Sequence, residues 1–401
     1  MDAVVVGAGW AGLGVSYELA QRSVRHRVFE RARIGETWRS QRWDSFRLNT
    51  PNEDTLMPGE RYAGSDPDGA MTHHEFIALL EEYARRHGLP VEEGRAVTSV
   101  TAEDGGFVVH LGNEAVRSAN VVIATGGLCR PLPRPRWAAS LPQPQSDGCD
   151  YRSSAALPAG PLLIVGSGQT GAQIAHDLAG SGRTVYLATG RVGRLVRRYR
   201  GRDMLRWMED SGFMDVRREE IIAAAGRLPG RGVIGATRTL SLQFLSAEGV
   251  VLTGRLTGLA DGRLTFAEDL ADHMRFADEA SANVKRFVDA YIERAGIAAV
   301  PAMDDPAETV APRLPVPPIL ALDAGELGSI IWCMGFSGDY SCVKVAGALD
   351  AQGSPVHRDG VGMVPGLYFA GIDFGTKRSS GTIRAVNEES SLFAELIASR
   401  C

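Results

Sequence analysis

Short apolar runs that alternate with glycine-rich turns open this chain. Residues 3–6 read Ala-Val-Val-Val, which is typical of a strand buried on both faces of a parallel sheet. After a glycine-rich turn, residues 15–21 continue as a helix, because Val15 and Leu19 are four positions apart and share one helix face. Residues 27–30 form a second strand. Together these elements make one complete β-α-β unit.

The same pattern returns in the middle of the chain. Residues 162–165 read Leu-Leu-Ile-Val and predict a second buried strand. A glycine loop follows at 166–171, then a helix with Ile174 and Leu178 on one face, then a strand at 184–188. Two separate β-α-β units predict two nucleotide-binding domains.

The rest of the chain is more varied. Residues 36–70 lack periodicity and predict a long irregular excursion. The capping box Thr72–Glu75 begins an amphipathic helix. The late strands 330–332 and 367–370 are expected to return to the sheet of the first domain. Further expected elements are an antiparallel set at 97–101, 107–111 and 115–117, a buried strand at 121–124, proline-rich crossings at 130–135 and 301–318, a largely helical region at 203–295 with a strand-like stretch at 250–266, and a C-terminal helix at 382–398.

These elements predict an α/β fold with two Rossmann-like dinucleotide-binding domains of the three-layer ββα/βαβ type. The first domain is expected to be discontinuous and to comprise residues 1–155 and 311–401. The second domain, residues 156–310, is inserted into the first and carries a helical excursion.

The first glycine loop has the spacing of a dinucleotide fingerprint. Gly7 allows the tight turn, Gly9 lets the backbone approach a pyrophosphate, and Gly12 lets helix and strand pack closely. The phosphates would lie at a helix N-terminus, where free N–H groups favour negative charge. Glu30 ends the next strand, where a carboxylate accepts hydrogen bonds from an adenosine ribose.

The second loop repeats this device with Gly166, Gly168 and Gly171, but Thr189 stands where an acid would follow. The absence of a carboxylate removes repulsion of a ribose 2′-phosphate, which favours NADPH over NADH. Arg191 and Arg194 follow and can pair with that phosphate, and Arg191 is the favoured one. Six arginines lie within twelve residues, and a solvated face or a nucleic-acid patch is the alternative interpretation. The six are Arg191, Arg194, Arg197, Arg198, Arg200 and Arg202.

Composition limits the other classes of function. The net charge of -5 disfavours nucleic acid and anionic membranes as partners. No apolar run approaches the ~20 residues needed to cross a bilayer. The five cysteines have no CxxC spacing, which disfavours a disulfide framework, a zinc site and a thioredoxin-type redox pair. Scattered reduced thiols and a strand that starts at residue 2 are expected of a cytoplasmic protein without a signal peptide.

Several stretches carry a family resemblance. The two loops, residues 34–39 and 42–48, and the link Ala124-Thr125-Gly126-Gly127 resemble class B flavin-dependent monooxygenases of the flavin-containing monooxygenase superfamily. The similarity is closest to bacterial FAD/NAD(P)-binding oxidoreductases and covers nearly the whole chain. It implies FAD in the first domain and NADPH in the second.

The resemblance also implies a role for individual residues. The FAD pyrophosphate would lie on the first loop, including Ala11, and the second loop, including Thr170, would hold NADPH. The C-terminal helix would aim its N-terminus at the flavin and stabilise the reduced anion. The remaining cofactor-binding residues implied are Glu30 and Arg31 at the FAD ribose, Val97 at the adenine, Thr37, Trp38 and Leu48 at the flavin, Thr125 and Gly126 at the domain junction, Asp373 at the ribityl chain, and Thr189 and Arg191 at NADPH.

The chain departs from the family pattern in places. Residues 146–152 contain no histidine where the fingerprint has one, which disfavours Baeyer–Villiger chemistry. Relatives place an asparagine near the flavin C4a and the nicotinamide amide, a role open to Asn49 or Asn52. Turn chemistry beside Pro51 is the alternative for both.

The resemblance implies that NADPH passes a hydride to FAD and that a C4a-peroxyflavin then transfers oxygen from O2 to a small organic substrate. No residue is assigned a catalytic acid–base role, because the flavin carries the chemistry. An NADPH-dependent reductase or oxidase that releases hydrogen peroxide is one alternative. A non-catalytic FAD- and NADPH-binding protein is another. The sequence is compatible with an oligomer.

Overall fold

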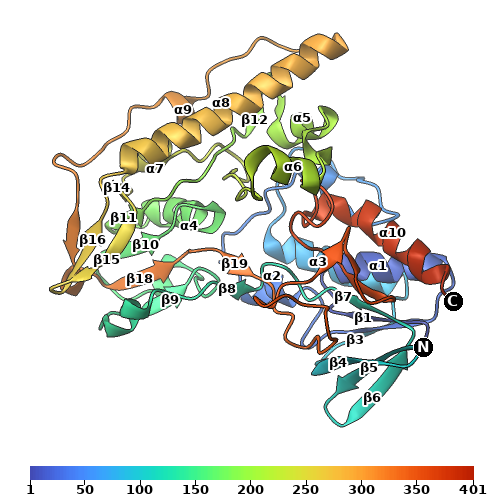
Figure 1. The fold of residues 1–401 in the computed structure, drawn as a ribbon. Coiled ribbons are helices and arrows are strands. Elements are labelled where there is room, and N and C mark those ends of the chain that lie inside the picture. The colour runs from blue at the N-terminus through green and yellow to red at the C-terminus, as the bar shows by residue number, and fades with distance from the viewer.

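Two parallel sheets organise the computed structural model, which describes residues 1–401 (Figure 1). The first sheet has seven strands in the order β20-β21-β22-β7-β1-β2-β3. The five strands from β22 to β3 are parallel, and β20 and β21 extend them as an antiparallel edge. The strands are β1 Ala3–Val6, β2 His26–Phe29, β3 Val91–Glu92, β7 Asn120–Ile123, β20 His357–Arg358, β21 Val361–Gly362 and β22 Leu367–Phe369.

The second sheet has five parallel strands in the order β14-β11-β10-β18-β9. They are β9 Gln145–Asp147, β10 Leu162–Val165, β11 Val185–Ala188, β14 Val251–Thr253 and β18 Ser329–Trp332. The α/β fold with two nucleotide-binding units, the first of them interrupted by the second, is thus confirmed.

One strand assignment from the sequence is wrong. Residues 330–332 were expected in the first sheet, but β18 pairs in register with β10 in the second sheet, and only 367–369 return to the first. The predicted boundaries at 155 and 311 disagree with this pairing, since they separate β18, and with it the edge strand β9, from β10. Any short apolar run suits the middle of either parallel sheet, so its composition does not choose between them.

Helices cover both sheets. In the first half, α1 (Trp10–Gln21) packs beside α10 (Val386–Ala398), and α3 (His73–Arg86) begins with the predicted capping box at Thr72 and Glu75 (Figure 1). The antiparallel strands β4 (Ser99–Glu103), β5 (Gly106–Leu111) and β6 (Glu114–Ser118) form the predicted satellite sheet. The remaining elements of this half are α2 (Glu36–Ser40), η1 (Asn52–Asp54) and η6 (Ile383–Ala385).

The second half contains α4 (Gln169–Ala179) after its glycine loop and a 26-residue helix, α8 (Leu270–Ala295), along its outer edge (Figure 1). A three-stranded antiparallel sheet, β15-β16-β17, lies at its far end. The other elements are α5 (Met204–Asp210), α6 (Arg218–Ala225), α7 (Leu242–Ala247), α9 (Pro306–Thr309), β12 (Arg198–Tyr199), β13 (Arg202–Asp203), β15 (Leu256–Ala260), β16 (Arg263–Phe266), β17 (Ala321–Asp323), η2 (Arg136–Ser140), η3 (Ser154–Ala156), η4 (Phe213–Asp215) and η5 (Ala324–Glu326).

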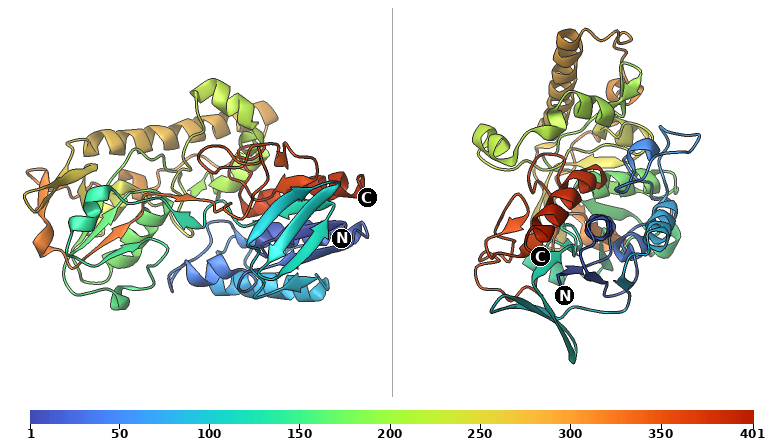
Figure 2. Two further views of the ribbon diagram at one scale, coloured as in Figure 1. Left: turned by 60° about the horizontal axis from the view of Figure 1, so that its bottom comes forward. Right: turned by 90° about the vertical axis from the view of Figure 1, so that its right-hand side faces the viewer.

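The chain passes between the halves twice, and the two crossings pair with each other. β8 (Arg130–Pro131), on the way out, and β19 (Phe336–Ser337), on the way back, form a two-stranded antiparallel ribbon. Figure 2 shows these narrow connections between the two sheet systems. None of the helices has the length and apolar character that a bilayer crossing requires.

Candidate functional site

The first glycine loop, residues 7–12, joins β1 to α1 with almost no room for side chains. Gly7 has a φ of +106°, and a Cβ added there would lie 2.5 Å from the carbonyl oxygen of Ala124. A Cβ on Gly12 would collide with the carbonyl oxygen of Gly7 itself. At Gly9, in contrast, nothing lies within 4 Å of an added Cβ. The loop is therefore closely packed on its protein side and open on the side from which a ligand would approach.

The second loop is built in the same way. Gly166 has a φ of +105°, and its added Cβ would collide with the carbonyl oxygen of Cys333, the residue that takes the place of Ala124. A Cβ on Gly171 would collide with the carbonyl oxygen of Gly166, and Gly168 again faces open space. Both halves thus contain the same glycine loop. We call residues 7–12 the first cradle and residues 166–171 the second cradle.

Neither helix that follows a loop has a side-chain cap. α1 begins after Gly9 and α4 after Gly168, and no side chain bonds to the first-turn N–H groups of either helix. Ala11 and Thr170 lie within these first turns. Unbonded N–H groups and the positive end of a helix dipole attract an anion, so each cradle fits one pyrophosphate.

Glu30 lies directly after β2, beside the first loop, and is 8% exposed. Its carboxylate accepts hydrogen bonds from the N–H of Ala8 at 2.9 Å and of Ala32 at 3.0 Å. Arg31 is exposed next to it. Val97 is half-buried in the loop before β4, and its backbone makes no hydrogen bond within the chain. The position of Glu30 suits a ribose at the edge of the first cradle.

Comparison with known proteins agrees with this geometry. The family model described as pyridine nucleotide-disulphide oxidoreductase matches residues 4–223, more than half of the chain. The chain belongs to this family. A curated relative is the oxidoreductase called CzcO-like of Geobacillus kaustophilus, which is 28% identical over 399 residues, 97% of this chain and 96% of the relative.

This oxidoreductase is also similar to flavin monooxygenases, in sequence to one and in fold to another. The indole-3-pyruvate monooxygenase YUCCA4 of rice is 29% identical over 195 residues, 44% of each chain. The solved flavin-containing monooxygenase of Stenotrophomonas maltophilia superposes with a TM-score of 0.67 at 18% identity, over 100% of this chain and 98% of that one. The predicted resemblance to the flavin monooxygenase superfamily and the prediction of an oxidoreductase are confirmed.

At the end of β11 in this oxidoreductase, the predicted NADPH residues differ in exposure. Thr189 is 2% exposed, and its hydroxyl lies 2.7 Å from the carbonyl oxygen of Thr253, to which it donates, and 2.9 Å from Nδ1 of His273. Arg194 is also buried and bonds to Asp278 and Glu308. Arg191 alone of these three is exposed, with its guanidinium 4.4 Å from the centroid of the Phe276 ring. Of these three side chains, only that of Arg191 is therefore accessible to a 2′-phosphate.

The residues predicted at the flavin end lie around one aromatic cluster. Trp38 is on α2 with Thr37 and packs edge-on against Phe76, with ring centroids 4.9 Å apart. Leu48 is buried in the hydrophobic core against which Trp38 packs. The guanidinium of Arg42 stacks on Trp38 at 4.7 Å without a carboxylate partner, and burial lowers its pKa to about 10. Arg42 was not predicted, because one arginine among many in 36–70 gives no local signal.

At the junction of the halves, Asp373 pairs with an arginine of the second half. Its carboxylate accepts from Arg231 Nε at 2.9 Å and Nη2 at 2.5 Å. Thr125 donates to the carbonyl oxygen of Asp339 at 3.1 Å, and Gly126 has a φ of +93°. Thr125, Gly126 and Asp373 thus lie where the halves meet, but Asp373 already has a protein partner.

The two candidate asparagines, Asn49 and Asn52, differ in their hydrogen-bond partners. Asn52 donates from its side chain to the carbonyl oxygen of Asp66 at 2.9 Å, as a turn residue does. The carboxamide oxygen of Asn49 instead accepts from Nε2 of Gln173 on α4, at 3.0 Å. Its main-chain carbonyl accepts from Nη1 of Arg197 at 2.8 Å. Asn49 is therefore the asparagine that the second half holds by both its side chain and its main chain.

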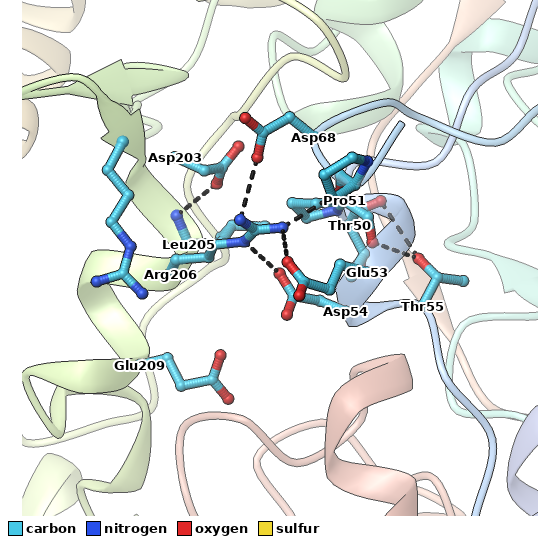
Figure 3. Close-up of polar contacts among 12 residues, drawn as sticks. Thr50, Pro51, Glu53, Asp54, Thr55, Asp68, Asp203, Leu205, Arg206 and Glu209 are labelled. Carbon is cyan, nitrogen blue, oxygen red and sulfur yellow. Dashed lines mark hydrogen bonds and ion pairs between the residues drawn. The ribbon is translucent and has the colours of Figure 1, made fainter. Parts of the chain in front are cut away.

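Charged groups fasten the segment after Asn49 to the second half. Arg206 on α5 forms ion pairs with Glu53 at 2.7 Å, Asp54 at 3.1 Å and Asp68 at 3.1 Å, and Figure 3 shows these carboxylates converging on its guanidinium. Arg384 also pairs with Asp54, at 2.7 Å. We call these five residues the ionic clasp.

Proposed function

We propose that this oxidoreductase is an FAD- and NADPH-dependent monooxygenase, with FAD on the first cradle and NADPH on the second. When bound, the flavin would supply the redox chemistry: electrons from NADPH would activate O2, one oxygen atom would pass to a small organic substrate, and the other would leave as water. The protein binds, orients and shields the two cofactors.

The observation that carries this proposal is the contact between Asn49 and Gln173. Gln173 is the fifth residue of α4, the helix that begins at the second cradle. Asn49 follows the aromatic cluster of the first half, eleven residues after Trp38. Their hydrogen bond supports a single cleft in which a nicotinamide from one cradle reaches a flavin from the other.

The sheet pairing supports a revised division of the chain. We propose that the FAD-binding half contains the strands up to residue 123 and those from 357 onward, and that the NADPH-binding half contains the strands from 145 to 332. The β8–β19 ribbon then marks the boundary between the halves, both where the chain leaves the first half and where it returns to it.

The cysteines do not favour thiol-based chemistry at this site. All five are free. Burial raises the pKa of Cys149 to about 11 and also raises the pKa of Cys333, which leaves these two thiols almost entirely protonated at neutral pH. Although the family name includes disulphide reductases, this chain has no CxxC pair to act as a dithiol.

The test is to load the purified protein with FAD, reduce it anaerobically with NADPH, and mix it with oxygen while recording flavin absorbance and hydrogen peroxide. A flavin adduct that precedes reoxidation supports the monooxygenase. Immediate, stoichiometric peroxide without an adduct would replace it with an NADPH oxidase or reductase. Failure of NADPH to reduce bound FAD would leave a non-catalytic binding protein.

A further inference from the structure

The side chain of Asn49 is held from the opposite half of the molecule. Its carboxamide oxygen accepts from Gln173, and its carboxamide NH2 makes no hydrogen bond within the protein. Asn49 and Gln173 are both half-buried. The Gln173 bond therefore fixes the side chain in one orientation and leaves its two N–H donors without a partner in the protein, so that they can bind a ligand.

The main chain at Asn49 is held from the second half as well. Arg197 is 5% exposed, pairs with the buried carboxylate of Asp203, and donates to the carbonyl oxygens of Gly235 at 3.0 Å and Asn49 at 2.8 Å. Since Arg197 is itself fixed inside the second half, it is a rigid anchor for the first-half loop.

The residues that follow are fixed by the ionic clasp. The turn η1, three residues after Asn49, presents Glu53 and Asp54 to Arg206 on α5 (Figure 3). Three second-half residues, Gln173, Arg197 and Arg206, thus hold one short first-half loop at its side chain, its backbone and its exit.

We propose that Gln173 is a positioning residue that orients the Asn49 carboxamide toward the nicotinamide and the flavin, so that the NADPH-binding half controls a hydrogen-bond donor at the reacting centre. This inference rests on the proposed function. Gln173 acts through Asn49 and touches neither cofactor. A donor aimed in advance loses no free energy to reorientation when charge develops on the flavin.

Two substitutions of Gln173 are expected to change the orientation of the Asn49 side chain in different ways. Gln173→Met keeps the volume of the side chain and removes the donor, so the Asn49 side chain becomes free to rotate. Gln173→Glu supplies only acceptors, so Asn49 turns its NH2 toward position 173 and presents its carbonyl oxygen to the cleft. Gln173→Glu is therefore expected to be as damaging as Asn49→Ala.

The experiment measures how fast hydrogen peroxide leaves the FAD-loaded, NADPH-reduced protein after mixing with oxygen in the absence of substrate. Asn49→Ala and Gln173→Met are each expected to release it about fivefold faster than the wild type, the size of one net hydrogen bond. The double variant is expected to be no faster than Asn49→Ala, because Gln173 acts only through that residue.

Gln145→Met is the matched control. Gln145 is also a half-buried glutamine with two internal hydrogen bonds, to Trp332 and Ala138, but it lies in β9 and does not contact the first half. It is expected to behave as the wild type. Equal rates for Gln173→Met and Gln145→Met, or multiplied effects in the double variant, would overturn the proposal.

A second readout separates this inference from the proposed function. Oxidised, FAD-loaded protein is titrated with NADP⁺, and the change in the flavin absorption spectrum is recorded. The change is expected to be weakened in Asn49→Ala and Gln173→Met but not in Gln145→Met. If even the wild type releases all its hydrogen peroxide at once, the protein is not a monooxygenase. The NADP⁺ titration then tests the positioning role of Gln173 on its own. A wild-type spectrum for Gln173→Met would then refute the positioning role.

Discussion

The first glycine loop predicts opposite effects on stability for two alanine substitutions, Gly9→Ala and Gly12→Ala. Gly9→Ala adds a Cβ where nothing lies within 4 Å, and the φ of -79° suits alanine. The fold itself is therefore not strained, and the loss of backbone freedom in the unfolded chain stabilises the cofactor-free protein by about 0.4–1 kcal/mol. The new methyl group instead occupies the space through which a pyrophosphate approaches.

Gly12→Ala makes the same chemical change on the other side of the loop. Its Cβ would collide with the carbonyl oxygen of Gly7. It would also lie 3.1 Å from the carbonyl carbon of Gly7 and 3.3 Å from the Cβ of Ala124. None of these atoms is the end of a flexible side chain, so α1 must move away from β1. Overpacking of this kind costs about 1–3 kcal/mol or more.

Urea unfolding of both cofactor-free variants and a fluorescence titration with FAD test these expectations. Gly9→Ala is expected to be as stable as the wild type, or more so, and to bind FAD about 10- to 100-fold more weakly, which corresponds to losing one charge-assisted hydrogen bond. Gly12→Ala is expected to unfold at lower urea. Wild-type FAD affinity in Gly9→Ala would refute the assignment of this loop to a pyrophosphate.

Four further predictions concern charged side chains. Arg191→Ala should raise the KM for NADPH about tenfold without changing the KM for NADH. Arg194→Ala removes a buried guanidinium from half-exposed Asp278 and from Glu308, which keeps Lys285 as a partner, and should lower the free energy of unfolding by about 1–3 kcal/mol. Arg206→Gln should cost about 1–2 kcal/mol in urea unfolding at low salt, and less at ~1 M salt, since half-exposed carboxylates of the ionic clasp are screened. Burial raises the pKa of Glu389 to about 7, so the folded protein holds this proton more tightly than the unfolded chain; the free energy of unfolding should fall as pH rises from about 4.5 to about 7, and Glu389→Gln should remove that slope.

Part of the candidate site could be predicted because its signals are local. The two loops were located from glycine spacing, and the structure gives Gly7 and Gly166 the positive φ values that only glycine adopts at ease. The capping box at Thr72 was likewise readable over four residues. For Thr189 and Arg194, position in sequence suggested a cofactor contact, but the structure directs both side chains inward.

The sequence by itself determined the two cradles, their helices and the α/β class, because turns and buried strands depend on residues that are neighbours along the chain. Only the tertiary structure decided that β18 joins the second sheet, that Asp373 pairs with Arg231, 142 residues away, and that Gln173 bonds to Asn49, 124 residues away. Such contacts depend on how two halves meet across the β8–β19 ribbon. No local run of residues encodes a partner that only the packing of the whole chain brings within hydrogen-bonding distance.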